Sequence, residues 1–355
     1  MVELYDAHRQ LFSRPDDERH ATLDALIACL EDREARTHEE RVDPAPLELW
    51  ARDDRLLSLQ TREGPVHMTD WLFSQVCRLS GAPPDFINKL PGPLAAEVLN
   101  TTRRLYGPTE NLGRVLVTTN GERLGRGIYS DIYVRIPDLE VARLLRDAAP
   151  DFRPGGEVAG RGMGGPAVPG ASGLYAGDRD LFAFLVRDDD RIQVRGQDLG
   201  RGLMVWNSEV TCRRIGYQTF LYDYVCANHI VWGAQEVVAR ERRHVGHVRA
   251  ILDELLAAIA ALRARGTVDE ERALVRTAIA TRFADDEQLA VASLREAGFT
   301  KAVAEGAAEI AVKERGDLSV WSVVAGLTAQ ARDLPNAGDR VELERAAGRL
   351  LETLR

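Results

Sequence analysis

The sequence predicts an α+β protein with a central mainly antiparallel sheet, an N-terminal helical subdomain and a C-terminal helical region. Short β-branched and aromatic runs, separated by turn residues, gather in the middle of the chain. Apolar residues at three- and four-residue steps dominate from residue 234 to the end. Strands and helices do not alternate, which argues against a doubly wound parallel sheet.

Residues 1–68 are predicted to form an acidic arm. Residues 1–60 contain 8 Arg against 15 Asp and Glu. Within residues 15–42, Leu23, Leu26, Ile27 and Leu30 have the spacing of one amphipathic surface helix. We therefore expect a single helix in an otherwise solvated segment.

Three helices are predicted between residues 69 and 104. Thr69 can cap the first helix, which Gly81 and Pro83 bring to an end. Shorter helices are expected at residues 84–89 and 93–104. The apolar side chains expected to be buried in this helical subdomain are Trp71, Phe73, Phe86 and Leu90.

The central sheet is predicted to begin with a hairpin. Asn120-Gly121 separates the β-branched run 114–119 from a returning strand at 126–134, and both turn residues accept positive φ. Pro137-Asp138 then opens a helix. Further strands are expected at residues 173–176, 181–187, 191–195 and 202–206, with Asp188-Asp189-Asp190 as a turn.

Three segments complete the expected organisation. Residues 154–173 are too rich in glycine for regular structure and are predicted to be a flexible loop. Residues 215–225 have apolar residues at three- and four-residue steps, which favours a helix over a strand. The helices expected beyond them are at 234–264, 268–282, 285–297, 299–314, 317–331 and 339–354, so that residues 251–355 form the C-terminal helical region.

Composition indicates a soluble, cytoplasmic protein. Hydrophobic content is 45% and charged content 28%, no apolar run reaches the ~18 residues of a membrane span, and four cysteines are scattered along the chain. The net charge is −9, yet residues 101–135 and 190–250 each carry +3. We expect these two basic stretches to share one face, where arginine forks could bind phosphates.

Residues 206–247 contain the highest density of polar and potentially reactive side chains in the chain. Cys226, His229, His244 and His247 are candidate metal ligands, because His-x-x-His on a continuous helix places two imidazoles on one side. Zinc is the metal that such a set would take, although no cofactor is required by the pattern. The polar cluster is Asn207, Ser208, Glu209, Asn228 and His244, and Asn207-Ser208-Glu209 is predicted to be a turn that bonds local backbone.

The same stretch carries a family resemblance. Asn207-Ser208-Glu209, Cys226-x-Asn228 and Arg243-His244-x-Gly246 resemble the DUF932 family of phage- and plasmid-associated proteins. Residues 126–138 and the motif Phe86-Ile87-Asn88-Lys89-Leu90-Pro91, with Leu99-Asn100, carry further matches. They span residues 69–250, which we expect to form a DUF932-like α+β core. The chain departs from the family pattern at His229, where a glycine is usual.

Three functions are compatible with these features. The first is a non-catalytic nucleic-acid-handling protein of a phage or plasmid, binding or annealing single-stranded DNA in replication or recombination. The second is a metal-dependent enzyme acting on nucleic acid or nucleotides through the Cys/His cluster, and the third is a homo-oligomeric assembly protein. The residues expected to contact single-stranded nucleic acid are Arg126, Tyr129, Tyr133, Arg213, Arg214, Arg242 and Arg243.

Overall fold

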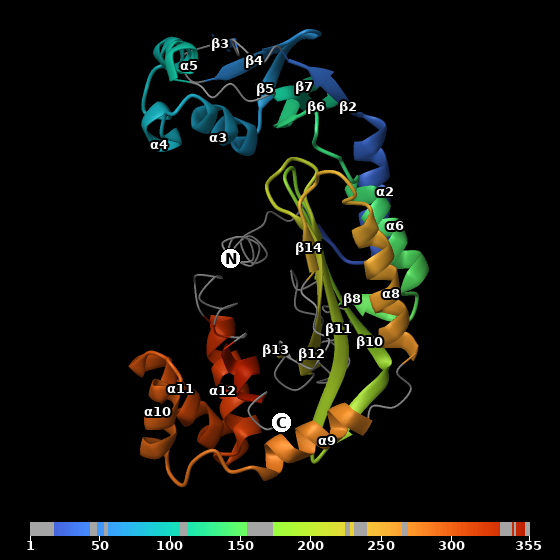
Figure 1. Cartoon of the computed structure of the whole chain (residues 1–355), viewed down its shortest axis with the longest axis vertical. Coiled ribbons are helices and arrows are strands. Elements are labelled where there is room, and N and C mark those ends of the chain that lie inside the picture. Colours follow the sequence, from blue (N-terminus) through green and yellow to red (C-terminus); the bar gives the residue numbers. More distant parts are fainter. Residues whose placement is uncertain are drawn as a thin grey trace.

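The described strands of this chain form two mainly antiparallel sheets with helices packed on them (Figure 1). The computed structural model describes residues 18–42, 48–52, 56–106, 112–154, 173–223, 228–230, 240–264, 269–333, 343 and 346–351. The predicted α+β class is confirmed, but two sheets replace the single central sheet. The predicted Gly-rich loop lies almost wholly outside the described residues.

Sheet A contains eight strands within the described ranges, in the order β1-β9-β10-β11-β12-β13, with β8 paired to β10 and β14 to β12. Every pair in this sheet is antiparallel. Its strands are β1 (Arg19–His20), β8 (Phe152–Pro154), β9 (Leu174–Ala176), β10 (Leu181–Val194), β11 (Gln197–Asn207), β12 (Ile215–Asp223), β13 (Asn228–Ile230) and β14 (Arg240–Arg242).

Three predictions for sheet A are wrong. The helix expected at 234–264 begins only at Ala250, and Arg240–Arg242 form β14, which pairs with β12. Residues 188–190 lie within the continuous strand β10, and the turn to β11 falls instead at Arg195-Gly196, where both φ angles are positive at 46° and 84°. Residues 215–223 form β12 rather than a helix, because β12 pairs with β11 along most of its length, from Trp206↔Gly216 to Leu199↔Asp223. Pairing to a long neighbour outweighs the local spacing of apolar residues.

Sheet B has the strand order β2-β6-β7-β5-β4-β3, and its one parallel pair within the described ranges is β5 with β7. The predicted Asn120-Gly121 turn is confirmed, since it joins β6 to β7 with Gly121 at φ +75°. Four strands of this sheet lie inside the segment predicted to be an arm, so residue 68 is no structural boundary. The strands are β2 (Thr37–Arg41), β3 (Leu49–Ala51), β4 (Leu57–Thr61), β5 (Gly64–Met68), β6 (Leu112–Asn120) and β7 (Glu122–Ser130).

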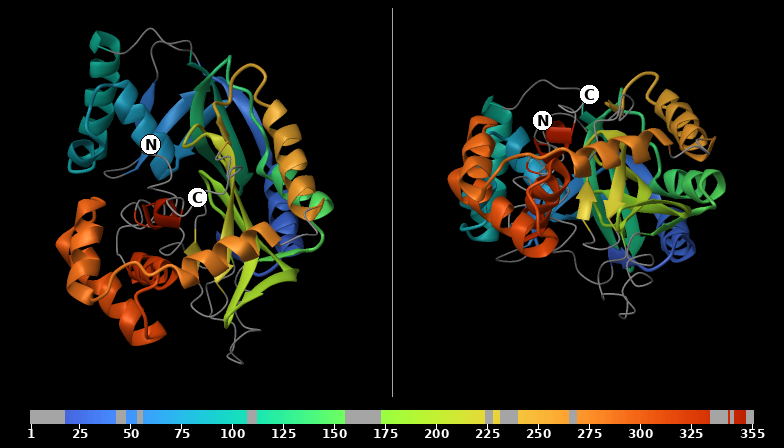
Figure 2. Two further views of the ribbon diagram at one scale, coloured as in Figure 1. Left: turned by 60° about the horizontal axis from the view of Figure 1, so that its bottom comes forward. Right: turned by 90° about the horizontal axis from the view of Figure 1, so that it is seen from below.

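Helices cover one face of each sheet. In sheet A, α2 (Leu23–Ala35), α6 (Asp138–Ala148) and α8 (Ala250–Ala264) lie side by side on one face and share a core with β10 and β11 (Figure 1, Figure 2). In sheet B, the predicted first helix is confirmed as α3 (Asp70–Leu79), capped by Thr69, which accepts a hydrogen bond from Leu72 N at 3.2 Å. It is followed by α4 (Pro84–Ile87) and α5 (Gly92–Tyr106).

The C-terminal helices have a core of their own. They are α9 (Asp269–Ala280), α10 (Glu287–Glu296), α11 (Lys301–Ile310), the π-helical segment η2 (Ala311–Arg315) and α12 (Val320–Asp333). Trp321 and its neighbours pack against Ile192, Val194 and Leu199, at the far end of the β10–β11 hairpin. Among the described helices, none has the length and apolar character needed to cross a membrane.

Candidate functional site

A buried cluster of charged side chains surrounds Glu209, just beyond the end of β11. The Glu209 side chain is 1% exposed. It accepts hydrogen bonds from Arg126 Nη1 at 2.7 Å, Arg135 Nη2 at 2.8 Å and the backbone N of Asp138 at 3.0 Å. Segments that are far apart in sequence and carry the DUF932-like motifs therefore meet at one carboxylate.

Asp138 supplies the second carboxylate of this cluster. It accepts hydrogen bonds from Arg33 Nη2 and from Asn207 Nδ2, each at 2.7 Å. Burial raises the pKa of Asp138 to about 6, and the neighbouring Glu209 charge adds to the rise. Burial also opposes ionisation of Glu209, but the guanidinium groups outweigh it and hold the pKa of Glu209 well below its usual range. Glu209 is therefore a permanent anion at neutral pH.

The turn after Glu209 joins the two sheets. Ser208 Oγ accepts from Cys212 N at 3.0 Å, which is a local backbone bond, and donates to the distant Arg179 O at 2.6 Å. The side chains of Asn207 and Glu209 bond residues distant in sequence, so local bonding describes Ser208 but not the other two. Trp71 of α3 donates its Nε1 hydrogen to Val210 O at 2.7 Å. In β7, a Cβ at Gly127 would lie 2.5 Å from Val210 Cβ, so only glycine permits this approach.

The predicted basic face is wrong for its two central arginines. Arg126 is 1% exposed and bound to Glu209, and Arg213 is 5% exposed with its Nη2 at 3.0 Å from Asp180 Oδ2. Arginines inside an acidic protein have found carboxylate partners within the fold. Arg242 pairs with Glu254, Arg214 is half-buried, and Arg243 is exposed.

The predicted stacking of bases on Tyr129 and Tyr133 is also wrong, because both rings are buried. Tyr129 donates its hydroxyl hydrogen to Glu39 Oε1 at 2.9 Å, and Tyr133 donates to Ser208 O at 2.7 Å. The two rings lie 4.7 Å apart between centroids, next to the Glu209 cluster. Aromatic residues on strands have here joined the core.

The predicted helical His-x-x-His pair is absent. His244 is buried, stacks on Tyr133 with 5.0 Å between centroids, and has Nδ1 3.1 Å from Val134 O. His247 is exposed, and Gly246 between them has φ +58°, which breaks any helical turn. Burial lowers the pKa of His244 to about 4. Cys226 lies outside the described residues, and the backbone of Asn228 and His229 pairs with β12.

A surface cleft of about 850 Å³ lies in the N-terminal part of the molecule, among α3, α4, α5 and strands β4 and β5. Many of its lining side chains are apolar, but the surface it exposes is more polar than apolar; Asp70, Asn88 and Lys89 supply the polar side chains, and all three are exposed. Gly92, the first residue of α5, also lines it, and the first turn of α5 contains no acidic residue. The remaining lining residues are Leu56, Leu57, Met68, Phe73, Ile87, Leu90, Pro91 and Ala95.

The cleft combines apolar side chains with groups that could bind an anion. Unpaired N–H groups and the macrodipole make a helix start attractive to anions, and Lys89 adds a full positive charge. The motif at residues 86–91 supplies much of this wall, but sequence reasoning gave it no role. Phe86, predicted to be buried, is 52% exposed. One signal was available: Lys89 is one of three lysines in the chain.

Comparison with known proteins adds no relative. No family model, no curated protein and no solved structure matches this chain. The DUF932 resemblance therefore stays a prediction, and the residues themselves carry the functional argument.

Proposed function

We propose that this protein handles single-stranded nucleic acid without catalysis, and that one nucleotide unit binds in the cleft beside α5. The observation that carries this proposal is a cleft that combines apolar side chains with polar groups, among them Lys89 and the start of α5. A nucleotide has the matching chemistry, since its base has apolar faces and hydrogen-bonding edges and its phosphate is an anion.

The dimensions and polar groups of the cleft fit such a unit. Its volume of about 850 Å³ lies within the range of small-molecule sites. Asn88 offers an amide, and Asp70 offers a carboxylate, to the hydrogen-bonding edge of a base. Lys89 and the N–H groups of Gly92 and Leu94 would attract the phosphate, since Pro93 has no N–H and Ala95 N donates to Pro91 O. The mobile-element setting of the proposal comes from the DUF932 resemblance alone.

This location changes the expected salt dependence. With Arg126 and Arg213 buried, one lysine and one helix start are the groups proposed to neutralise phosphate. One or two phosphate contacts give a slope of log K against log salt of about −0.7 to −1.4 for a single strand. With these slopes, the affinity for a single strand should fall roughly three- to sevenfold between 50 and 200 mM salt. A broad arginine groove would give a much steeper loss.

Fluorescence anisotropy with a labelled oligothymidine tests the proposal. Lys89→Ala should weaken binding several-fold and flatten the salt dependence. Lys301→Ala is the matched control, because Lys301 lies on α11 near Glu305, outside the cleft, and should bind as wild type does. Absence of binding at ~50 mM salt, where phosphate contacts are strongest, would remove the proposal. Equal affinities of the two variants would remove the cleft as the site.

Lysine acylation gives a second readout of the same site. The chain has Lys89, Lys301 and Lys313 as its complete set of lysines, so peptide mass spectrometry can follow each separately. Bound oligothymidine should slow acylation of Lys89 and leave Lys301 and Lys313 unchanged. Uniform protection of all three would indicate aggregation rather than binding in the cleft.

Self-assembly is a second candidate function, favoured by strand β3. It ends the strand order of sheet B, and Trp50 at its centre is 59% exposed. The Asn100 side chain of α5 already bonds the backbone N and O of Leu49 at this edge, so the exposed Trp50 side chain is the surface that would contact another chain. Light scattering should give a mass above one chain that Trp50→Lys reduces. A monomer at every concentration contradicts this candidate.

A further inference from the structure

Sheet B curls until β2 meets the turn between β4 and β5. These strands are well separated in the strand order, yet Arg62 N donates to Arg41 O at 3.2 Å. Thr61 Oγ1 also donates to Glu40 Oε2 at 2.5 Å. The result is a seam at which two distant parts of one sheet come together.

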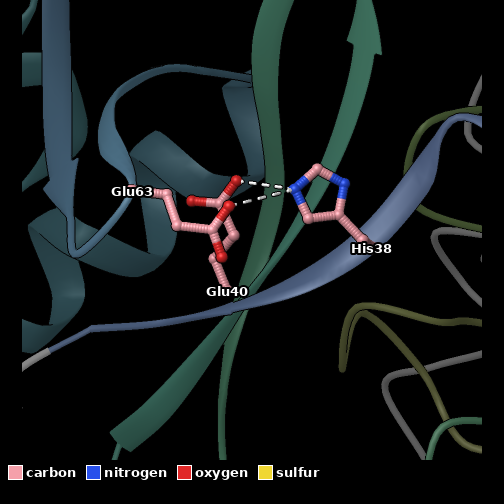
Figure 3. Close-up of side chains that lie close together, drawn as sticks. All are labelled: His38, Glu40 and Glu63. Atoms are coloured by element: carbon pink, nitrogen blue, oxygen red, sulfur yellow. Dashed lines mark hydrogen bonds and ion pairs between the residues drawn. The ribbon is translucent and has the colours of Figure 1, made fainter.

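Three side chains with metal-ligand chemistry face one another across this seam: His38, Glu40 and Glu63 (Figure 3). His38 Nε2 is 2.8 Å from Glu40 Oε1 and 3.8 Å from Glu63 Oε2. One ligand atom from each residue lies within 4.8 Å of the others. In the part of the chain that the structure describes, this is the one such group of three His, Cys, Asp or Glu residues.

Glu40 is held as a metal ligand needs to be held. Its side chain is 0% exposed, and its Oε2 accepts hydrogen bonds from Arg123 Nη2 and Thr61 Oγ1, each at 2.5 Å. One oxygen of the carboxylate is therefore fixed by outer partners, and Oε1 lies 2.8 Å from His38 Nε2. Such outer partners orient ligands in metal sites.

We propose that His38, Glu40 and Glu63 bind a divalent transition-metal ion, with Zn²⁺ as the representative. One imidazole nitrogen and two carboxylate oxygens suit Zn²⁺ or Mn²⁺, whereas Mg²⁺ and Ca²⁺ prefer oxygen ligands throughout. Zinc bonds of about 2.0–2.2 Å require ligand atoms roughly 3–3.5 Å apart. His38 and Glu40 are already near that spacing, and Glu63, 60% exposed on a turn, has room to close on the ion.

Charge and exposure set the character of this site. Arg123 offsets one of the two carboxylates, so the group with neutral His38 has a net charge of −1, and a divalent ion brings it to +1. The affinity should therefore be micromolar rather than that of a closed four-ligand site. The partial exposure of His38 and Glu63 leaves room for water to complete the coordination. Because the ligands come from both sides of the seam, the ion would tie β2 to the β4–β5 turn.

Calorimetric titration of the metal-free full chain with Zn²⁺, followed by thermal melting, tests this site. We expect one Zn²⁺ per chain with micromolar affinity and a higher melting temperature with the metal. His38→Ala and Glu63→Gln should each weaken binding at least about tenfold and abolish the rise in melting temperature. Millimolar Mg²⁺ should not compete.

His67→Ala is the matched control. His67 is also a partly exposed histidine of sheet B, with Nε2 3.6 Å from Glu122 Oε2, but no second carboxylate joins it in a metal-ligand group. It should bind Zn²⁺ as wild type does. Absence of stoichiometric binding below ~100 µM Zn²⁺, or unchanged binding by both His38→Ala and Glu63→Gln, overturns the proposal.

Discussion

Replacement of Glu209 by Gln should strongly destabilise this protein. Gln keeps the size of the side chain but removes the charge that Arg126 and Arg135 share. Arg33, whose Nη2 lies 3.7 Å from Glu209 Oε2, loses part of its counter-charge as well. Breaking a buried ion pair by removing one partner costs about 3–5 kcal/mol, because an uncompensated charge remains inside.

The same change at an exposed pair gives the scale. Glu140 pairs with Arg249, and their side chains are 35% and 55% exposed, so Glu140→Gln should cost about 0–1 kcal/mol. For a chain of 355 residues, each kcal/mol corresponds to roughly 1–1.5 °C in melting temperature. Thermal melting followed by circular dichroism at pH 7 should therefore give a fall of about 4–7 °C for Glu209→Gln. For Glu140→Gln the fall should be at most about 1.5 °C.

The outcome that contradicts this reasoning is equal melting temperatures for the two variants. The cluster would then be hydrated or rearranged, so that Glu209 is not the main counter-charge. A second variant separates charge from packing: Arg126→Met combined with Glu209→Gln removes both partners of the most buried pair. It should recover part of the lost stability, because it also removes the buried Arg126 charge that Glu209→Gln alone leaves uncompensated.

Three further predictions concern the same region. Arg213→Ala should lower the melting temperature because it removes the guanidinium that pairs with the buried Asp180 carboxylate. Arg243→Ala, at an exposed position, should leave the melting temperature unchanged. Similar melting curves for the two variants would mean that Arg213 is a surface residue. Because burial lowers the pKa of His244 to about 4, its contribution to stability is fully present above pH ~6.5 and is lost as pH falls through 4. Urea unfolding should therefore show the advantage of wild type over His244→Gln shrinking by about 3 kcal/mol between pH 7 and 4, and a constant difference contradicts burial of the neutral ring. Gly127→Ala should destabilise the fold, because the added methyl group would collide with Val210. Val210→Ala in the same chain should restore part of the lost stability. A neutral effect of Gly127→Ala would mean that β7 and the turn at Val210 can move apart freely.

Local signals predicted much of the secondary structure. The Thr69 cap, the Gly81 end and the Asn120-Gly121 turn each act through their own backbone conformation, and the structure has all three. The strands between residues 37 and 68 were missed because each has at most five residues, too few for a clear alternating pattern. Their stability comes from pairing with one another and, for β2 and β5, with β6 and β7, which a local pattern does not contain.

The candidate sites were harder to predict than the elements. The polar density around Glu209 was visible in the sequence, but its meaning depended on partners as distant as Arg33 and Arg126. Arg126 and Arg213, both expected on a binding face, are buried instead because each pairs with a carboxylate distant in sequence. The cleft beside Lys89 arises from packing of separate helices and strands, so no single motif outlines it.

The length of β10 links two parts of the molecule that could otherwise unfold independently. Its first half, including Leu181 and Leu185, belongs to the core shared by α2, α6 and α8, whereas Ile192 and Val194 belong to the core of the C-terminal helices. Loss of the C-terminal helices would expose the far end of the hairpin without dissolving its near end. Hydrogen exchange along this single strand should therefore divide at its register shift between Arg187 and Ile192. Amides on the two sides would report the opening free energies of two cooperative units through one continuous backbone.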